Sequence, residues 1–558
     1  MSDNDLDNQL NNRRGWFTRF LDVVEWLGNL LPHPVTLFII FCAGIIILSG
    51  LGEWLGWGVE DPRPEGTADR APDGRIEAES LMNADGFRRI LQNLVTNFTG
   101  FAPLGTVLVA LLGVGVAEHA GLIKTGIRGM VLSVLSIKPQ VKDPENAGFL
   151  KKTGAKILDP KNLVTITLIF AGVISNTASE LGYVVLVPMG AVVFYSVGRH
   201  PLAGLAAAFA AVSGGYSANL ILGTIDPLLA GITEEAARMI APEYTVHAAV
   251  NWYFMIVSTF MITAVGTFVT LYIVEPKLGK YDPSQAMGDL SEYDDAMAPL
   301  TQKEKDGLKA AFVSVIVMAG ILLLLILPEN AWLRDPETGG ILVSGSPLLN
   351  SIVALIFIGF IIPGIAYGKV AGTIKSDRDV INGMANSMST LGLYIVIVFF
   401  AAQFVNYFRW SNLGEIFAVN GAQIIEATGM PGPLIFIAFI IISGFVNLMM
   451  GSASAQWAFT STIFVPMLML TGYSPEVIQA AYRIGDSVTN IITPMMTYFG
   501  LILAFANRYD KNLGIGTIIS MMLPYSMFFF IGWVVLFILW VFVLGLPVGP
   551  GSPTFFDG

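Results

Sequence analysis

Two charged residues stand three positions apart in a stretch of the chain that is otherwise typical of a membrane span. In "AAYRIGDSVTNIITPMMTYFG", residues 480–500, Arg483 and Asp486 precede Pro494. Each charge costs roughly 2.5–3.5 kcal/mol at the centre of a membrane helix. Their i, i+3 spacing places both on one helix face, where they can pair. Such a pair either locks two helices together or forms part of a binding site.

The surroundings of the pair favour the binding site. Ser, Thr and Asn490 follow the charges, and Pro494 predicts a break in the helix. A break frees carbonyl groups for a cation and exposes a helix N-terminus to an anion. Because a guanidinium suits bidentate recognition of a carboxylate, we expect Arg483 to bind a substrate carboxylate. Asp486 would tune Arg483 or take part in ion coupling.

A matching pattern occurs earlier in the chain, in "SGGYSANLILGTIDP". Here Ser217 and Asn219 precede an apolar turn, Asp226 and Pro227, as Ser and Asn490 precede Pro494. Asp226 could be a capping residue before the proline, or it could bind a proton or a cation. The sequence leaves both roles open.

A third group of candidates lies in "GSASAQWA", where Ser454 and Trp457 are three residues apart. Trp457 could stack on an aromatic ring of a substrate, with Ser454 beside it. The alternative is a tryptophan of the interfacial belt, which is common in membrane proteins.

The elements that carry these residues are predicted to be membrane helices. Of the 558 residues, 54% are hydrophobic and 13% are charged, about half the charged share of a soluble domain. We therefore expect an all-α polytopic membrane protein with nine transmembrane helices. The predicted spans are residues 35–51, 92–117, 203–229, 248–275, 310–327, 348–366, 383–405, 480–505 and 515–546.

Two further apolar stretches are predicted to be re-entrant hairpins. Residues 162–197 have "SNTASE" between two arms of about 20 Å, which are too short for a core of roughly 30 Å. This places Ser175, Asn176 and Thr177 at the tip of the first hairpin. Residues 432–471 have "GSASAQWA" between their arms. Because the first of these arms is long enough to span the membrane, length alone is weaker evidence that this hairpin is re-entrant.

The two hairpins resemble each other, since both run from small hydroxyl residues to an arm with Val-Pro-Met, and an interrupted span follows each. The first enters from inside and the second from outside, so the copies are opposed, inverted repeats. Paired interrupted segments of this kind indicate a transporter site at mid-membrane.

Charge fixes the predicted orientation and divides the chain. Every lysine falls in loops assigned to the cytoplasm, so the N-terminus is expected inside and the C-terminus in the periplasm. The predicted divisions are an interfacial N-terminus (1–34), a first half (35–275), a cytoplasmic linker (276–309), a second half (310–546) and a periplasmic tail (547–558). The acidic loop 52–91 is expected to be a solvated cap or a dimer contact rather than a binding site.

Several functions are disfavoured by composition. A net charge of −11 argues against a nucleic-acid partner, and a lone cysteine with four scattered histidines gives no metal-ligand cluster. Motifs for ATP hydrolysis or covalent catalysis are not found. We therefore expect no enzyme and no cofactor beyond a coupling H⁺ or a possible Na⁺. The residues expected to couple the ion are Asp226, Ser175, Asn176, Thr177, Asn219 and Asp486.

The quoted motifs, together with "SPEVIQAAYRIGD" and "LLAGITEEAA", resemble the p-aminobenzoyl-glutamate transporter (AbgT) family over nearly the whole chain. The resemblance implies a homodimer in a bacterial inner membrane and secondary transport of p-aminobenzoyl-glutamate or related folate-pathway compounds. Some relatives export sulfonamide antimetabolites in exchange for protons. The family's functional residues fall on Asp226, Ser454, Trp457, Pro475, Arg483, Asp486 and Pro494, all with the expected identity. The long acidic loop is the departure from the family.

The sequence therefore predicts a carrier that works by alternating access, with both hairpin tips enclosing one site. A proton-driven antiporter that exports sulfonamides is the first alternative. A passive organic-anion channel is an alternative of another class, since it also needs an arginine in a polar path, but it requires no inverted hairpins. An intramembrane enzyme is a weaker option, because no nucleophile–base pair is evident.

Overall fold

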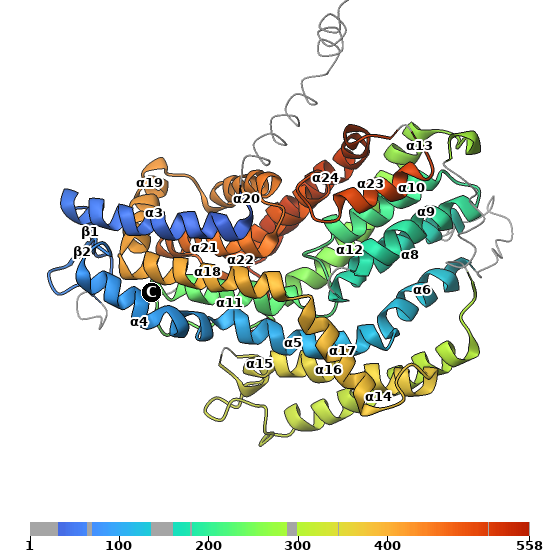
Figure 1. Ribbon diagram of the computed structural model, residues 1–558, viewed down its shortest axis with the longest axis horizontal. Helices are drawn as coiled ribbons and strands as arrows, with labels where there is room; N and C mark the ends of the chain where they lie inside the picture. Colours follow the sequence, from blue (N-terminus) through green and yellow to red (C-terminus); the bar gives the residue numbers. More distant parts are fainter. Residues whose placement is uncertain are drawn as a thin grey trace, which may run out of the picture.

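The computed structural model describes residues 32–63, 70–135, 160–178, 181–286, 298–343, 345–511 and 513–556. Within these ranges the chain is mainly helical, and Figure 1 shows the helices gathered in one elongated bundle. The acidic loop contributes an antiparallel pair of strands, β1 (Gly58–Glu60) and β2 (Arg75–Glu77), with Val59 opposite Ile76. The predicted N-terminal helix and most of the lysine-rich loop lie outside the described residues.

Nine helical segments of the described residues are long and apolar enough to cross a membrane. They are α3 (Pro34–Leu55), α4 with α5 (Ala84–Thr99 and Ala102–His119), α12 with its extension to α13 (Trp252–Val269 and Glu275–Leu278), α14 (Gln302–Ile326), α16 (Ile352–Ala371), α18 (Gly392–Trp410), α20 (Gly432–Met449), α21 (Ala453–Leu470) and α24 (Ile515–Phe537). Shorter helices outside the hairpins and the interrupted spans are α6 (Leu122–Leu135), α15 (Pro347–Asn350), α17 (Asp377–Ser389) and α19 (Leu413–Thr428).

The predicted number of nine is confirmed, but its members differ from the prediction. The predicted spans 203–229 and 480–505 are broken helices, and both arms of the second hairpin take their places in the set of nine. The predicted span 383–405 is also wrong at its start, because the chain breaks between α17 and α18 at Thr390 and Leu391. The end of the polar helix α17, with the sequence "NSMS", was thus included in a span that begins only at α18.

The two hairpins differ in regularity. In the first, α8 (Pro160–Ser175) runs about 24 Å to a 3₁₀ turn, η1 (Asn176–Ala178). The chain returns through a π-helical turn, η2 (Gly182–Leu186), and α9 (Val187–Ser196). In the second hairpin, α20 and α21 are regular helices of 18 residues each, joined at Met450–Ser452. The arms of the first hairpin are thus short, as predicted, and those of the second approach the thickness of a bilayer.

Each hairpin is followed by a helix that stops inside the molecule. The helix α10 (Pro201–Phe209) continues as a π-helical turn, η3 (Ala210–Gly214), and α11 (Ile225–Ala237) begins after an irregular segment. In the second half, α22 (Pro475–Asn490) ends before residues 491–498, which contain Pro494, and α23 (Phe499–Asn507) follows. Proline cannot donate a backbone hydrogen bond, so it suits such a break.

The helix α22 occupies the centre of the bundle (Figure 1), where α11, α20, α21 and α24 contact it. Every residue of α22 is buried except Thr489. This helix is far less apolar than its neighbours, so its polar side chains must find partners inside the protein. The helix α22 is therefore the most polar of the helices at the centre of the bundle.

Candidate functional site

The two helix interruptions meet each other in the middle of the molecule. The backbone N–H of Ser217 donates to Ser487 Oγ at 3.1 Å, and Ser213 Oγ lies 3.3 Å from Met496 Sδ. Both contacts join the break after η3 to the region around the end of α22. Segments that the sequence separates widely are thus brought to one place, as the repeat predicted.

Arg483 forms an ion pair with Asp226, at 2.7 Å between Nη2 and Oδ1. The two side chains are only 3% and 1% exposed. The expectation that Arg483 pairs with Asp486 is wrong: Asp486 instead accepts a hydrogen bond from Asn490 at 3.2 Å. An i, i+3 spacing put Arg483 and Asp486 on one face, but α11 packs against that face and offers a carboxylate from the other half.

Asp226 has the capping role that the sequence left open and also forms an ion pair, while its role as a proton or cation site stays a prediction. Its Oδ2 accepts the backbone N–H of Gly223 at 2.7 Å, so it caps the irregular segment before α11. Its Oδ1 faces Arg483 in the ion pair. Breaking a buried ion pair by removing one partner costs roughly 3–5 kcal/mol, because a charge is left unpaired. Asp226 therefore ties the two halves together at the site.

The tip of the first hairpin contacts the interrupted helix of its own half. Asn219 Nδ2 donates to Thr177 Oγ1 at 2.9 Å, while Ser175 Oγ donates to the carbonyl of Gly172 at 2.6 Å. A Cβ on Gly223 would lie 3.2 Å from the carbonyl oxygen of Asn176. The Asn176 side chain is buried, and neither its Oδ1 nor its Nδ2 has a hydrogen-bond partner among the described residues.

These tip oxygens are the groups that could hold a hard cation such as Na⁺, which prefers oxygen ligands. Among the described residues, no three His, Cys, Asp or Glu side chains gather as a metal site. The oxygens that the described residues offer here are those of amides, hydroxyls and carbonyls, and Asp226 is joined to this place through Gly223. The ion-coupling role stays a prediction.

The tip of the second hairpin packs on the break after α22. A Cβ on Gly451 would lie 2.3 Å from the carbonyl oxygen of Met495, so only glycine permits this approach. Thr493 Oγ1 donates to the carbonyl of Leu448 at 3.0 Å. Pro494 is the residue between these two contacts, in the broken segment where it was predicted.

A cavity of about 240 Å³, which we call the central cavity, lies where both halves meet. Ser454 and Asn490, two of the predicted site residues, line it. Further lining comes from the second hairpin tip (Gly451–Ser454), from the two breaks and from α5 and α18. Four tyrosines also line it: Tyr183, Tyr216, Tyr394 and Tyr498. Its walls are therefore aromatic with a few polar groups, which is typical of small-molecule sites.

The tyrosines were not predicted. Tyr183 and Tyr498 stack with ring centroids 4.9 Å apart and planes 5° from parallel, one from each half of the molecule. A parallel aromatic pair offers an apolar face to a flat ligand. The signal in the sequence was the position of both tyrosines beside the predicted hairpin and the predicted break.

Asn447 is a second residue that the sequence did not indicate. Its Nδ2 lies 2.8 Å from Asn490 Oδ1 and 2.9 Å from the carbonyl of Asp486. Asn447 thus fixes the end of α22 against the second hairpin. An amide in the middle of the apolar arm "FVNLMM" was the available signal, because buried polar residues in membrane helices are costly.

Five of the seven predicted substrate-binding residues do not line the central cavity, namely Trp457, Pro475, Arg483, Asp486 and Pro494. Trp457 is fully buried, where its ring stacks on Tyr482 at 4.2 Å and its Nε1 donates to Thr233 Oγ1 at 2.9 Å. Pro475 begins α22, about 22 Å along the helix from Asn490. In this conformation neither touches the cavity, and their direct contact with a substrate stays a prediction.

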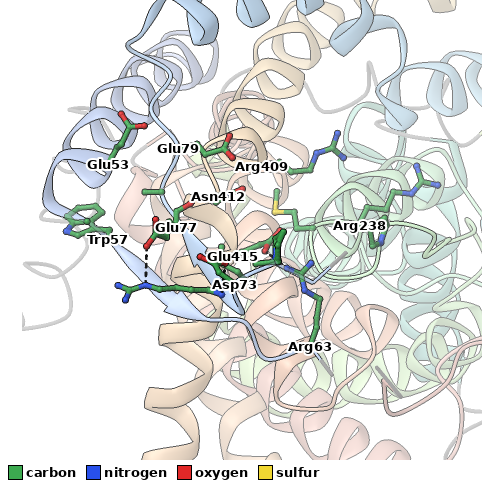
Figure 2. A pocket seen from close by; sticks show the side chains of 18 residues that line it. Glu53, Trp57, Arg63, Asp73, Glu77, Glu79, Arg238, Arg409, Asn412 and Glu415 are labelled. Atoms are coloured by element: carbon green, nitrogen blue, oxygen red, sulfur yellow. Dashed lines mark hydrogen bonds and ion pairs between the residues drawn. The ribbon is translucent and has the colours of Figure 1, made fainter. Parts of the chain in front are cut away.

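A second, larger cavity of about 820 Å³ lies at the end of the molecule that carries β1, β2 and the C-terminal segment, which we call the strand end. Figure 2 shows Glu53, Glu77 and Glu79 on the loop side of this strand-end cavity, with Arg238 and Arg409 on the opposite side. The acidic loop 52–91 therefore does more than cover the surface, because it forms one wall of a charged cavity.

The loop wall is held by Asp61. Its carboxylate pairs with Arg63 at 2.7 Å, and Arg63 also reaches Glu415 at 3.3 Å. Burial raises the pKa of Asp61, but the hydrogen bonds from Arg63 and from the backbone of Ala71 lower it more, so that the pKa falls to about 2. Asp61 is thus charged at neutral pH and anchors the loop.

The chain is similar to known transport proteins. The family model described as "AbgT putative transporter family" matches residues 19–139 and 141–556. The p-aminobenzoyl-glutamate transport protein of Escherichia coli (strain K12) is 34% identical over 528 residues, which make up 95% of this chain and 95% of that protein.

Two solved structures are also similar. The structure of MtrF from Neisseria gonorrhoeae, described as illuminating a class of antimetabolite efflux pumps, is 56% identical, with a TM-score of 0.85. The match covers 96% of this chain and 100% of that chain. The YdaH transporter of Alcanivorax borkumensis, described as having an unusual topology, is 40% identical with a TM-score of 0.79, over 93% of this chain and 100% of that one.

Proposed function

The chain belongs to the AbgT transporter family, and from this membership we propose that it is a secondary active transporter of p-aminobenzoyl-glutamate or a related aromatic carboxylate. We also propose that both hairpins are re-entrant, that the protein is a homodimer and that the strand end faces the periplasm. An H⁺ or Na⁺ gradient would drive transport by alternating access.

The observation that carries the proposal is the buried ion pair between Arg483 and Asp226, which follows Ile225 of the central cavity's lining in the chain. Asp226 and a substrate carboxylate would compete for one guanidinium. Protonation of Asp226 would release Arg483, so a proton and a carboxylate would bind together rather than exclude each other. This linkage couples the substrate to the ion without any further group.

The tyrosine walls and Ser454 would hold the aromatic amide part of the substrate. Asp486 accepts a hydrogen bond from Asn490, which lines the cavity. Trp457 stacks on Tyr482, whose hydroxyl donates to the carbonyl of the lining residue Ala453. Pro475 and Pro494 mark the two ends of the moving unit, the buried helix α22 and its break. One charge that moves down about 100 mV contributes roughly 2.3 kcal/mol, enough for a gradient of roughly forty-fold.

The test is uptake of labelled p-aminobenzoyl-glutamate into proteoliposomes of the purified protein, with pH and Na⁺ gradients imposed in both directions. Accumulation above the external concentration under one of these gradients is expected. A passive anion channel would equilibrate the substrate but never concentrate it. Failure to move the substrate at all would contradict the proposal.

Export of antimetabolites is a second candidate, because the chain is 56% identical to MtrF and only 34% identical to the p-aminobenzoyl-glutamate transport protein. A sulfonamide carries an aromatic ring that the tyrosine walls could stack, but it has no carboxylate for Arg483. Addition of sulfonamide to the same vesicles separates the two functions. An exporter would drive the drug against its gradient, whereas a dedicated importer would not.

A further inference from the structure

Glu476 is a buried acid at the strand end of α22 that the proposed function does not use. It is 3% exposed, and both of its carboxyl oxygens lie 3.0 Å from the hydroxyl of Tyr244. Among the described residues, the structure shows no ion pair to this carboxyl. A carboxylate buried without a cation is costly, whereas a carboxyl that carries a proton is not. Glu476 therefore fits a protonated acid in this conformation.

Glu476 begins a polar stripe that runs along α22 to the central cavity. The stripe continues with Gln479, Arg483, Asp486 and Asn490, at spacings of three and four residues, which place all five on one helix face. All five are buried. The stripe thus links the strand end to the central cavity through the interior of the protein.

Hydrogen bonds fasten the strand end of this stripe to neighbouring elements. Gln479 Nε2 donates to Asn251 Oδ1 at 2.7 Å, and Gln479 Oε1 lies 2.6 Å from Thr233 Oγ1. Thr233 in turn receives the Trp457 Nε1–H of the second hairpin. These hydrogen bonds therefore connect the strand end of α22 to α11 and to the second hairpin, so a shift of α22 would change their contacts.

Tyr244 joins Glu476 to the strand-end cavity. Its hydroxyl contacts the acid, and its carbonyl accepts from Arg238 Nε at 3.1 Å. Arg238 lines the strand-end cavity, as Figure 2 shows, and forms an ion pair with Glu234 at 2.7 Å. The route from the cavity to the acid therefore passes one partly buried tyrosine.

The C-terminal segment covers this place. Ser474 Oγ donates to the carbonyl of Pro553 at 2.6 Å, and the ring of Phe556 packs edge-on against Tyr244 at 5.9 Å. On the neighbouring loop, burial lowers the pKa of His247 to about 4, and its Nε2 lies 3.0 Å from the carbonyl of Pro550. His247 is thus uncharged near pH 7, and Tyr244 with the Arg238–Glu234 pair completes the titratable surroundings of Glu476.

We propose that Glu476 is a second proton-binding site of the transport cycle, reached from the strand-end cavity past Tyr244. The acid takes up or releases its proton when Tyr244 and the C-terminal segment move aside, and it carries the proton while α22 is buried. This inference rests on the proposed function, since it requires a proton-coupled carrier. Asp226 and Glu476 would then bind one proton each.

The experiment measures how steeply substrate accumulation depends on the pH gradient. Wild type and Glu476→Gln are reconstituted in vesicles with the membrane potential clamped at zero, and the steady-state substrate ratio is read at several pH gradients. Loss of one coupled proton lowers this ratio tenfold per pH unit of gradient. Glu476→Gln is expected to show this loss but to keep substrate–substrate exchange, which needs no net proton movement.

The matched control is Glu243→Gln, an exposed acid on the same loop as Tyr244, which should leave the ratio unchanged. An unchanged ratio in Glu476→Gln would overturn the inference. If the wild type exchanges substrate but does not accumulate it in response to a pH gradient, the proton site at Glu476 would also be overturned. The proposal that the protein transports the substrate would then still stand. Absence of exchange in wild type would instead contradict the proposed function.

A second variant covers the case in which Glu476→Gln does not yield a monodisperse protein. Glu476→Asp keeps the acid but withdraws it from Tyr244 by one methylene. It should keep the wild-type ratio and transport more slowly. A tenfold lower ratio per pH unit in this variant would count against the proton site.

Discussion

The two halves of the site share an architecture but differ in what they supply. In the first half, an irregular hairpin tip carries Asn176, whose side chain has no hydrogen-bond partner among the described residues, and the helix after the break carries an acid, Asp226. In the second half, Asn447 fastens a regular hairpin to the end of α22, the helix that carries Arg483. The two halves therefore differ in the charged and polar groups that they bring to the site.

The two hairpin tips also differ in how closely they are held by the rest of the protein. Asn447 holds an arm of the second hairpin to the end of α22, and Gly451 lies against the backbone of the break at Met495. The first tip makes hydrogen bonds through Thr177 and Asn219, whereas the polar atoms of the Asn176 side chain have no hydrogen-bond partner among the described residues. The role of Asn176 in ion coupling stays a prediction.

The largest effect is expected from removal of the charge that joins the halves. Arg483→Ala should abolish transport, because no guanidinium remains for the substrate carboxylate, and it should destabilise the protein by roughly 3–5 kcal/mol, because Asp226 is left unpaired. The exposed Arg409→Ala is the matched control and should transport normally. Vesicle uptake measures both. Near-normal uptake by Arg483→Ala would remove the carboxylate role.

The double variant Asp226→Asn with Arg483→Gln sharpens this result. It removes both charges, so thermal unfolding should occur closer to wild type than in Arg483→Ala. Transport should stay lost, because no guanidinium remains for the carboxylate. Recovered transport would mean that the pair serves structure alone.

The next effect compares two glycines at equivalent contacts. Gly451→Ala should lower transport about tenfold and destabilise the protein by about 1–3 kcal/mol, since the new Cβ meets a backbone carbonyl at 2.3 Å. Gly223→Ala, with its nearest atoms at 3.2 Å, should be milder. Equal effects in uptake and unfolding would show that the two tips are equally rigid.

The two asparagines should separate stability from ion coupling. Asn447→Ala should cost about 1–3 kcal/mol of stability, because its hydrogen-bond partners are left unpaired. Asn176→Ala should change stability by less than about 0.5 kcal/mol but weaken the apparent affinity for the coupling ion several-fold. Unfolding curves and the ion dependence of uptake test the pair. A destabilised Asn176→Ala with normal ion dependence would reverse the assignment.

The smallest effect on transport is expected from Asp61→Asn at the strand end, which should instead lower the stability of the protein. The pKa of Asp61 is lowered to about 2, so its stabilising contribution is present above pH ~4 and is lost as the pH falls toward 2. Asp61→Asn should lose about 2 kcal/mol at pH 7, and its difference from wild type should shrink over that acid range. Thermal unfolding against pH measures this. A difference that persists at pH 2 would exclude the ionised form as its cause.

Much of the fold was predictable because membrane helices leave a strong local signal. Apolar runs located α3, α12, α14, α16 and α24, and proline with small polar residues located both interruptions. The break between α17 and α18 was missed, since no proline or charge marks it. Ser454 and Asn490, which were predicted as site residues, line one cavity, whereas its tyrosines were missed although Tyr183 and Tyr498 lie beside the predicted hairpin and the predicted break.

The sequence by itself determined that this is a helical membrane protein with two interrupted helices, and that Arg483 must be buried at a cost. It did not determine the partner of Arg483. Helical periodicity states which residues share a face, but the neighbour of that face depends on how distant segments pack. Only the tertiary structure brought Asp226 to Arg483, left Asp486 to Asn490 and placed Glu476 beneath Tyr244.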